Sequence, residues 1–330
     1  MPSASKKLVV CAALLSLIFL AVPYFIARVL EPNTSYESVI MEPVIVTPRT
    51  TFEVQQKSRI QVYSRSRELC PFERYLVGVV AAEVPALFHM EALRAQAVAA
   101  RTYAIYSMRT LDMDEFDYGR ISEIWQAYLT EADMRRRWGD DFDIHFGTIW
   151  EAVASTRGEI LIYDDEPILA VYHAFSGGRT EYSQNVWSAP RPYLRSVSSD
   201  FYTYRADFEY VREFSVGEFV SLLRTAFPNI VLDSNNIMAQ ININERSAAG
   251  YILRITIGNQ TMDATQLRSI LGLRSTNFTI AQSGDKVIFR TRGHGHGVGM
   301  SQLGANALAH QGYSYVEILK HYFSGALLAV

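Results

Sequence analysis

The sequence predicts an α+β protein, with mixed helices and antiparallel strands preceded by one N-terminal transmembrane helix. Three observations lead to this fold class. Leu8–Ala27 is an apolar run without a charged residue, and His89–Thr110 is rich in strong helix formers. Glu159–Phe175 contains two short apolar runs separated by turn residues.

The N-terminal run is about long enough to cross a bilayer as a helix. Lys6 and Lys7 precede it and should stay in the cytoplasm, which sends the rest of the chain outside. We expect residues 1–7 to be cytoplasmic, 8–27 to be an uncleaved signal-anchor, 28–57 to be a linker or extended arm, and 58–330 to form one extracytoplasmic domain. A cleaved signal peptide is the alternative, but no clean small-x-small site follows the run.

The first half of the expected domain has clear local signals. Ser58–Ser64 alternates as a strand does, and Pro71–Val84 starts with proline and continues with helical apolar spacing. His89–Thr110 is the strongest helix, with a stripe of small residues against which another backbone can pack. Glu159–Phe175 reads as a hairpin that turns at Asp164–Asp165.

The second half is less regular. Gly177–Gly178 breaks the chain, and Asp200 to Asn277 gives mixed signals, with a helix in Ser215–Phe227 and a strand in Ala248–Asn259. A loop rich in glycine and histidine follows, and Ser301–Gly312 is expected to form a final helix.

Composition excludes several classes of protein. The chain has 330 residues, 49% of them hydrophobic and 20% charged, and its formal net charge is -3. That balance is typical of a globular protein and gives no basis for nucleic-acid binding. Cys11 lies in the apolar run, so Cys11 and Cys70 form neither a disulfide framework nor a metal-site pair.

Glu83 is out of place in its surroundings. It follows Val79–Ala82 and precedes Val84 and Pro85, all apolar. Burial among apolar neighbours disfavours the charged form of a carboxyl, so the pattern predicts a raised pKa and a general acid. A structural pairing of Glu83 with Arg101 is the alternative. For Arg101 itself, contact with the substrate and a core-facing position paired with a carboxylate both remain open.

The segment Arg292–Ala305 places glycine at every other position around His294 and His296. Such a run suits close approach of a ligand or of another backbone. The two histidines supply only two zinc ligands, and the loop lacks the lysine of a P-loop. A polar binding wall and a tight glycine corner both remain open.

Tyr172–Trp187 mixes hydroxyl, amide and aromatic side chains after an expected strand. Aromatic faces stack on sugar rings and hydroxyls match sugar hydroxyls, so the segment suits a glycan as well as it suits an ordinary turn. Ser176 does not lie in the nucleophile elbow of a serine hydrolase.

Three segments together, Val79–Ile105, Ala152–Trp187 and Gly293–Ala326, resemble the SpoIID/LytB family. The resemblance covers roughly Ser58 to Gly325. It implies a lytic transglycosylase that cuts the β-1,4 bond between N-acetylmuramic acid and N-acetylglucosamine, around a glycan-binding cleft. The family motif A-A-E-(M/V)-P places the catalytic glutamate at Glu83.

The resemblance also implies a cellular setting. It indicates septal wall degradation during engulfment in sporulation, on peptidoglycan glycan strands stripped of stem peptides. It implies a location in the mother-cell membrane, with an amidase of the SpoIIP type and a membrane protein of the SpoIIM type as partners. The rival interpretation within this family is a non-catalytic, glycan-binding enhancer of a cell-wall amidase.

A glycoside hydrolase needs a second carboxylate, and Glu181 is the one candidate in the segment Tyr172–Trp187. A transglycosylase needs one carboxyl that acts as acid and then as base, because the muramic acid 6-hydroxyl is the nucleophile. The residues expected to bind substrate are Arg101, Ser176, Gly178, Thr180, His294, His296, Ser301 and Gln302.

The chain departs from its relatives in one segment. Relatives often carry a zinc-binding His/Cys pattern before Gln-Ala-Tyr, and the corresponding positions here are Met113, Gly119 and Ile124. None of these can coordinate zinc. We therefore expect no metal and no cofactor, and some other contact to hold Gln126–Tyr128 in place. A zinc hydrolase that uses His294 and His296 is the third and weakest interpretation.

Overall fold

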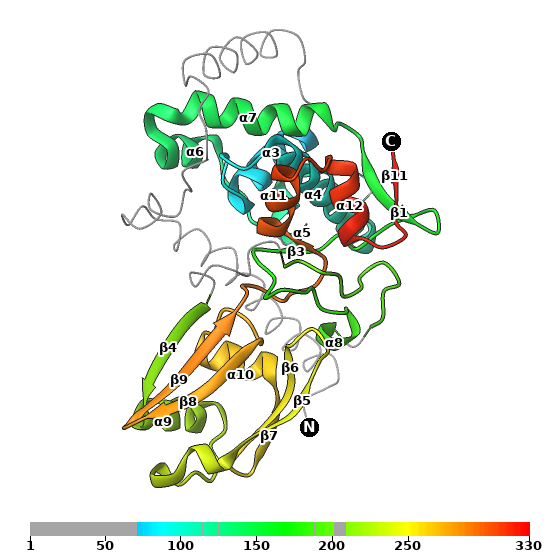
Figure 1. Cartoon of the computed structure of the whole chain (residues 1–330). Coiled ribbons are helices and arrows are strands. Elements are labelled where there is room, and N and C mark those ends of the chain that lie inside the picture. The colour runs from blue at the N-terminus through cyan, green and yellow to red at the C-terminus, as the bar shows by residue number, and fades with distance from the viewer. Residues whose placement is uncertain (1–70, 114, 125, 188, 201–208) are drawn as a thin grey trace, which may run out of the picture. The chain divides into compact units, whose positions relative to one another are not determined.

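The structure is a computed structural model that describes residues 71–113, 115–124, 126–187, 189–200 and 209–330 (Figure 1). The expected span Leu8–Ala27 and the expected strand Ser58–Ser64 lie outside these residues. In the described part of the chain, no helix is both long enough and apolar enough to cross a membrane.

The described residues form two compact units. The first contains residues 71–160 and the two C-terminal residues 329–330, and the second contains residues 161–328. Each unit is described below by itself.

The first unit is built from helices (Figure 1). They are α3 (Pro71–Glu83), α4 (Met90–Thr110), α5 (Ile121–Ile124), α6 (Glu131–Trp138) and α7 (Phe142–Ser155), with short 3-10 turns at Tyr118–Arg120 and Gly139–Asp141. Helices α3, α4 and α7 pack against one another, and Leu76, Val80, Leu93 and Ile149 in their core have no exposed surface.

Local sequence explains where these helices begin. Pro71 starts α3, since its fixed φ suits the first helical position. His89 caps α4 by accepting the Glu91 N–H at Nδ1 (3.3 Å). Both predicted helices are confirmed. Helix α6 was not predicted, although Thr130 and Asp133 form a capping box at its start.

The predicted hairpin is confirmed at its turn. Strands β1 (Ile160–Tyr163) and β2 (Glu166–Pro167) pair antiparallel, and Asp164 and Asp165 have φ values of 51° and 62°. Two successive positive φ values are typical of a type I′ turn. Strand β11 (Leu327–Ala329) completes this sheet in the order β11-β1-β2.

The rest of the predicted hairpin forms a different pairing. Strand β3 (Tyr172–His173) lies parallel to β10 (Met300–Ser301), with Tyr172 opposite Met300 and His173 opposite Ser301. The predicted antiparallel pairing is confirmed in the other sheets of the described residues, and this short parallel pair was not predicted. The parallel pair joins the glycine-histidine loop to the segment Tyr172–Trp187.

The second unit contains two further antiparallel sheets, ordered β4-β9-β8 and β5-β6-β7. The strands are β4 (Glu209–Ser215), β5 (Ile241–Arg246), β6 (Ile252–Ile257), β7 (Gln260–Asp263), β8 (Phe278–Ser283) and β9 (Lys286–Arg292). The helices are α8 (Gln184–Trp187), α9 (Val216–Ala226), α10 (Ala264–Leu271), α11 (Gln302–His310) and α12 (Tyr315–Tyr322), with 3-10 turns at Ser234–Asn236 and Met238–Gln240.

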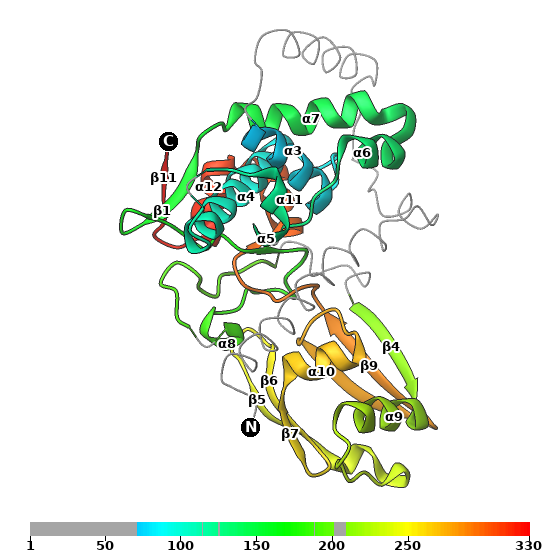
Figure 2. The same ribbon diagram turned by 180° about the vertical axis from the view of Figure 1, so that it is seen from behind.

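One apolar core lies between these sheets and their helices. Helices α9 and α10 cover one face of the strands, and Figure 2 shows them in front of the strands. The Phe289 ring lies 5.5 Å from Phe278 and 5.8 Å from Phe219, measured between ring centroids. The predicted helix in Ser215–Phe227, the strand in Ala248–Asn259 and the final helix in Ser301–Gly312 are confirmed as α9, β6 and α11.

Candidate functional site

Glu83 is the last residue of α3 and is half-buried. The residues before it, from Tyr75 to Ala82, are all buried, and so is Val84. The apolar neighbours that were expected to enclose the carboxyl therefore belong to the core of the first unit. Glu83 is the partly exposed residue that ends this buried stretch of the helix.

Two tyrosines lie within the electrostatic reach of Glu83. Burial is the main cause of the raised pKa of Tyr75, followed by the charges of Tyr103 and Glu83. Burial is also the main cause of the raised pKa of Tyr103, and the Glu83 charge adds to that rise. Both phenols therefore keep their protons at neutral pH near this carboxyl. The sequence interpretation missed both tyrosines.

Arg101 is not available to a substrate. Its side chain is 1% exposed and pairs with Glu73, with Nε–Oε1 at 3.0 Å and Nη2–Oε2 at 2.8 Å. Nη2 also donates to the carbonyl of Val153, while Nη1 donates to the Thr156 hydroxyl and the Glu159 carbonyl. All five guanidinium donors are used within the core. The expected substrate contact of Arg101 and its pairing with Glu83 are corrected, whereas the interpretation of Arg101 as a core-facing arginine paired with a carboxylate is confirmed.

The segment that departs from the zinc pattern is held against α3 by other contacts. Gln126 accepts a hydrogen bond from the Tyr75 hydroxyl (3.1 Å) and donates to the Ala100 carbonyl (3.1 Å). The Tyr128 ring stacks on Tyr75 at 5.5 Å, and the Leu129 N–H donates to the Gly78 carbonyl. Gln126 therefore joins α3 to α4 beside the residues that surround Glu83.

The positions aligned with zinc ligands add apolar packing to this segment. Met113 is 7% exposed and Ile124 has no exposed surface. Within the described ranges, no three His, Cys, Asp or Glu side chains lie close enough together to hold a metal ion. Packing and the Gln126 bridge account for how this part of the fold is held.

In the second unit, Ser176 is fully buried beside His173. The Ser176 Oγ lies 2.7 Å from His173 Nε2, and His173 Nδ1 lies 3.0 Å from the Val298 carbonyl. Because that carbonyl can only accept, Nδ1 carries the proton, and the Ser176 hydroxyl donates to Nε2. The expected substrate contact of Ser176 is corrected, since its hydroxyl has no exposed surface and is bonded to His173.

The two loop histidines are half-buried, and burial lowers the pKa of each to about 4. Arg274 and Arg268 add to the effect at His294, and Arg268 adds to it at His296. His296 uses both ring nitrogens, because Nε2 lies 3.0 Å from the Tyr172 carbonyl and Nδ1 accepts the Val298 N–H. Its ring lies 5.0 Å from that of Trp187. A zinc site that uses His296 would have to break one of these bonds.

The other polar residues expected at the site serve the backbone of the second unit. The Thr180 hydroxyl donates to the Arg195 carbonyl and accepts the Val197 N–H. Ser301 caps α11 by accepting the Gly304 N–H, and it also accepts the Ser176 N–H. Both side chains have no exposed surface.

Gln302 is 4% exposed, so its predicted contact with substrate is also corrected. Gly178 is half-buried, with φ of 113°, and its carbonyl accepts the Ser199 N–H. Of the residues expected to bind substrate, Gly178, His294 and His296 keep a partly exposed surface. The sequence interpretation missed the role of His173. The polar residues that follow the expected strand were a signal that could have indicated it.

Comparison with known proteins shows which family the chain resembles. A family model described as SpoIID, stage II sporulation protein, matches residues 64–163. Stage II sporulation protein D of Bacillus subtilis (strain 168) is 34% identical over 269 residues, which cover 81% of this chain and 76% of that protein. The protein of the same name from Bacillus amyloliquefaciens is 36% identical over 265 residues, which cover 79% of this chain and 75% of that protein.

This chain belongs to the stage II sporulation protein D family. The resemblance that the sequence motifs indicated is confirmed. An amidase enhancer of Bacillus subtilis (strain 168) is a more distant relative of this SpoIID family member, 29% identical over 300 residues that cover 77% of this chain and 40% of that protein. The family model includes Glu83, Arg101 and Gln126, which belong to the first unit.

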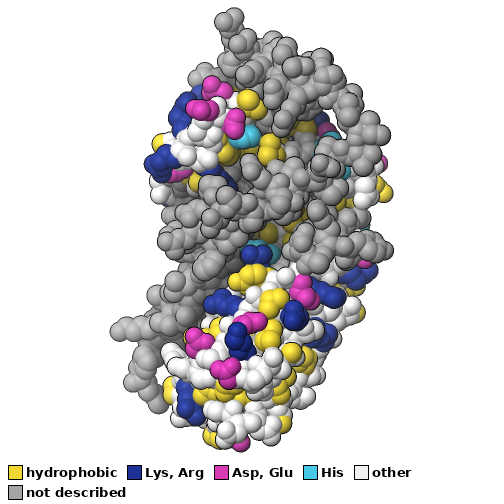
Figure 3. All heavy atoms as spheres, turned by 60° about the vertical axis from the view of Figure 1, so that its left-hand side comes forward, with side chains coloured by type: hydrophobic (Ala, Val, Ile, Leu, Met, Phe, Trp, Pro, Cys, Tyr) yellow, Lys and Arg dark blue, Asp and Glu magenta, His cyan; other side chains and the backbone are white. Residues whose placement is uncertain are grey.

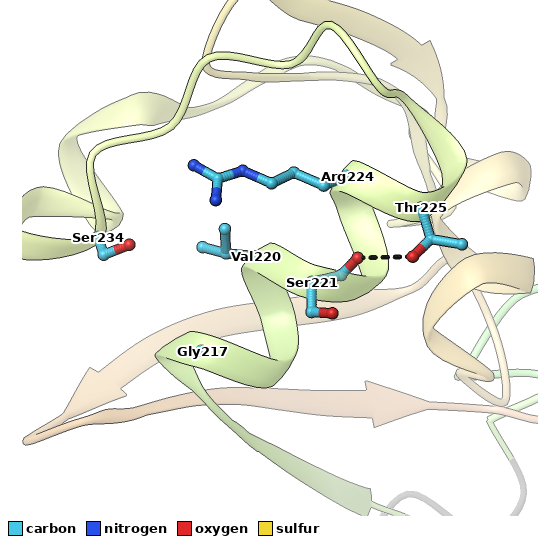
Figure 4. Close-up of a pocket in the computed structure, with 6 residues that line it drawn as sticks. All are labelled: Gly217, Val220, Ser221, Arg224, Thr225 and Ser234. Atoms are coloured by element: carbon cyan, nitrogen blue, oxygen red, sulfur yellow. Dashed lines mark hydrogen bonds between the residues drawn. The ribbon is translucent and has the colours of Figure 1, made fainter.

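One open hollow of this SpoIID family member contains none of the predicted site residues. It lies on α9 and is lined by Gly217, Val220, Ser221, Arg224, Thr225 and Ser234 (Figure 4). The only contact drawn within it is local, since the Thr225 hydroxyl donates to the Ser221 carbonyl at 2.9 Å. On the described surface in Figure 3, basic and acidic side chains are interspersed rather than gathered into one basic patch.

Proposed function

We propose that this protein is a lytic transglycosylase that cuts the β-1,4 bond between N-acetylmuramic acid and N-acetylglucosamine in peptidoglycan. The observation that carries the proposal is the position of Glu83. It is a partly exposed carboxyl at the end of a helix whose preceding two turns are buried. It also occupies the glutamate position of the A-A-E-(M/V)-P motif within the matched family region.

In the proposed reaction, Glu83 acts first as an acid. Its carboxyl proton passes to the O4 oxygen of N-acetylglucosamine while the bond from C1 of the muramic acid to that oxygen breaks. The resulting carboxylate then removes the proton from the 6-hydroxyl of the same muramic acid. The 6-oxygen bonds to C1, which gives a 1,6-anhydro end and returns the proton to Glu83. Water is not consumed.

The surroundings of Glu83 suit this cycle. A helix C-terminus carries the negative end of the helix dipole, where a neutral acid is favoured over a carboxylate. The protonated phenols of Tyr75 and Tyr103 lie near enough to feel its charge, and neither can act as a second base at neutral pH. Glu83 thus has neighbours that do not compete for its proton.

A one-carboxyl mechanism also agrees with the position of Glu181. That residue has no exposed surface, and its Oε1 accepts the Tyr182 N–H (2.7 Å) and an Asn185 N–H (2.9 Å). Its Oε2 is buried without a hydrogen-bond partner in the described protein, so neither oxygen faces solvent, whereas the second carboxylate of a hydrolase must reach the sugar or a water beside it. This supports transfer to the internal hydroxyl over hydrolysis.

The proposal extends to the cellular setting. We propose that the protein is anchored by Leu8–Ala27 in the mother-cell membrane and degrades septal peptidoglycan during engulfment. Glycan strands without stem peptides would be its substrate. An amidase of the SpoIIP type would prepare those strands, and a membrane protein of the SpoIIM type would be its partner in the membrane. Membership of the stage II sporulation protein D family supports this setting.

The test is mass analysis of glycan digests. Wild-type protein should release fragments with 1,6-anhydro-muramic ends, and Glu83→Gln should release none while keeping the fold. Glu91→Gln is the matched control, because Glu91 is a half-buried carboxylate in the next helix that pairs with Arg94. Anhydro ends from Glu83→Gln at the wild-type rate would refute the assignment.

A second candidate function is a non-catalytic, glycan-binding enhancer of a cell-wall amidase. The relative named as an amidase enhancer favours it. It predicts that wild type and Glu83→Gln both leave glycan strands uncut and raise amidase turnover equally. The same pair of proteins therefore separates the two functions.

A further inference from the structure

The last turn of α3 is completed by a residue from another helix. In a continuous α-helix the Ala81 carbonyl would accept the N–H of residue 85, but residue 85 is proline and has none. The Arg137 guanidinium supplies the missing donor, with Nη1 3.1 Å from the Ala81 oxygen. Arg137 is thus anchored on the same helical turn that carries Glu83.

This contact uses only part of the guanidinium. Arginine has five N–H donors, and one Nη1 donor is occupied by Ala81. In the described part of the chain, no carboxylate forms an ion pair with Arg137. Its neighbours Arg135 and Arg136 do have such partners, in Glu131 and Asp133. The N–H groups on Nε and Nη2 of Arg137 can therefore donate to an anion. The described protein does not supply that anion.

Arg137 is also withdrawn from water to a greater extent than its neighbours. Arg135 and Arg136 are exposed, whereas Arg137 is half-buried, and desolvation lowers its pKa. A partly desolvated, unpaired cation is costly to the folded protein, and a bound carboxylate would offset that cost. The rigid fork of arginine fits a carboxylate with two parallel hydrogen bonds, which lysine cannot do.

We propose that Arg137 binds the lactyl carboxylate of the N-acetylmuramic acid whose glycosidic bond is cut. This inference rests on the proposed function and names the feature of the substrate that the site selects. The lactyl ether is attached to C3 of the ring that is cleaved at C1, so its carboxylate lies near the scissile bond. The contact of Arg137 is with the Ala81 carbonyl, which lies two residues before Glu83 in the last turn of α3.

The proposal explains a preference for glycan strands without stem peptides. A stem peptide is joined to the lactyl group by an amide, which removes the negative charge and one oxygen acceptor. Only a muramic acid freed of its peptide presents a carboxylate to Arg137. The free carboxylate would be the chemical signal that the preceding amidase step has taken place.

The test measures binding in the full chain carrying Glu83→Gln, so that strands are not cut. The probes are peptide-free glycan strands and the same strands with their carboxyl groups reduced to alcohols. The Glu83→Gln protein should bind the native strands about tenfold to hundredfold more tightly than the reduced ones. Adding Arg137→Gln should remove that preference, whereas adding Arg136→Gln, a change at an exposed neighbour, should keep it.

Arg137→Lys is the second variant, since it can still donate to Ala81 if the glutamine variant fails to fold. It should keep the fold and lose most of the preference. An equal preference in the Arg137 variants and the parent would overturn the assignment, and so would a parent that does not distinguish the two probes. Failure of the proposed function is seen separately, as the absence of anhydro ends from wild-type digests.

Discussion

Arg101 and Glu73 form a two-pronged ion pair that is closed off from solvent, with side chains 1% and 4% exposed. The pair joins α4 to α3, and the remaining Arg101 donors reach the Val153 carbonyl at the end of α7 and the residues just after it. One arginine therefore holds three helices of the first unit. This arrangement explains why a charged residue is found in a helix of small apolar residues.

Replacing Arg101 should unfold the protein rather than weaken substrate binding. Arg101→Lys keeps the charge but loses the two-pronged pairing with Glu73 and leaves the Val153 and Glu159 carbonyls without this donor. We expect a loss of about 3–5 kcal/mol in the free energy of unfolding, measured by urea denaturation. Arg94→Gln is the control, because its pair with Glu91 is partly exposed, and its loss should be about 1 kcal/mol or less. A stable Arg101→Lys protein with impaired glycan binding would contradict the structural role.

Gly78 should not tolerate a side chain. A Cβ atom at this position would lie 2.3 Å from Cε2 of Tyr128 and 2.6 Å from the Leu129 carbonyl oxygen. Gly78→Ala should therefore displace the segment that stacks on Tyr75, at a cost of about 1–3 kcal/mol in stability, measured by thermal unfolding. Gly217→Ala is the matched control, because Gly217 is exposed in α9 and the added Cβ meets only the Ser215 hydroxyl at 4.0 Å. The control should be neutral or stabilising by up to about 1 kcal/mol.

The fold could be predicted where its signals are local. Proline at the start of α3, the helix formers of α4 and the Asp164–Asp165 turn each act within a few residues, and the structure confirms all three. The parallel pairing of β3 with β10 joins residues more than a hundred positions apart, and no local pattern records it. The helices of residues 131–155 were left unassigned although α6 has a local signal, the capping box of Thr130 and Asp133.

The candidate site shows the same limit. Glu83 could be picked out as a candidate because a carboxyl within a run of apolar residues is unusual, and that run is visible in the local sequence. The role of Arg101 was left open and its partner was not identified, because Glu73 lies in another helix and looks like an ordinary surface residue in the sequence. Ser176 and Thr180 have hydroxyls that suit sugars, but the same hydroxyls also satisfy buried backbone groups, and only tertiary structure decides between these roles.

The loop histidines should make stability depend on pH. Burial is the first cause that lowers the pKa of His294 to about 4, and the charges of Arg274 and Arg268 follow. In the unfolded chain a histidine binds a proton near pH 6.5, so between about pH 6.5 and 4 the unfolded state holds more protons. Stability should therefore fall as pH falls through this window, by up to about 1.4 kcal/mol per pH unit for each such histidine.

Urea denaturation of His294→Asn at pH 7, 6 and 5 checks this prediction. The variant should lose less stability than wild type over that range, because one of the titrating groups is gone. His310→Asn serves as the control, since His310 is exposed in α11 and the variant should follow the wild-type curve. If wild type and His294→Asn had identical slopes, the depressed pKa of His294 would be ruled out.

Replacing Gln96 should stabilise the protein, in contrast to the destabilising substitutions of Arg101 and Gly78. It lies in α4, is 1% exposed, and neither its Nε2 nor its Oε1 has a hydrogen-bond partner in the described protein. An unsatisfied buried polar group costs about 1–3 kcal/mol, so Gln96→Leu should raise the free energy of unfolding by an amount of that order.

Gln126→Leu is the matched control for this change, and it should be destabilising. Gln126 accepts from the Tyr75 hydroxyl and donates to the Ala100 carbonyl, both of which the substitution would leave without this partner. Thermal unfolding of the two variants side by side measures the contrast, and a destabilised Gln96→Leu would show that the amide is satisfied in solution. A stabilised Gln96→Leu that forms fewer anhydro ends would instead indicate a role in the reaction.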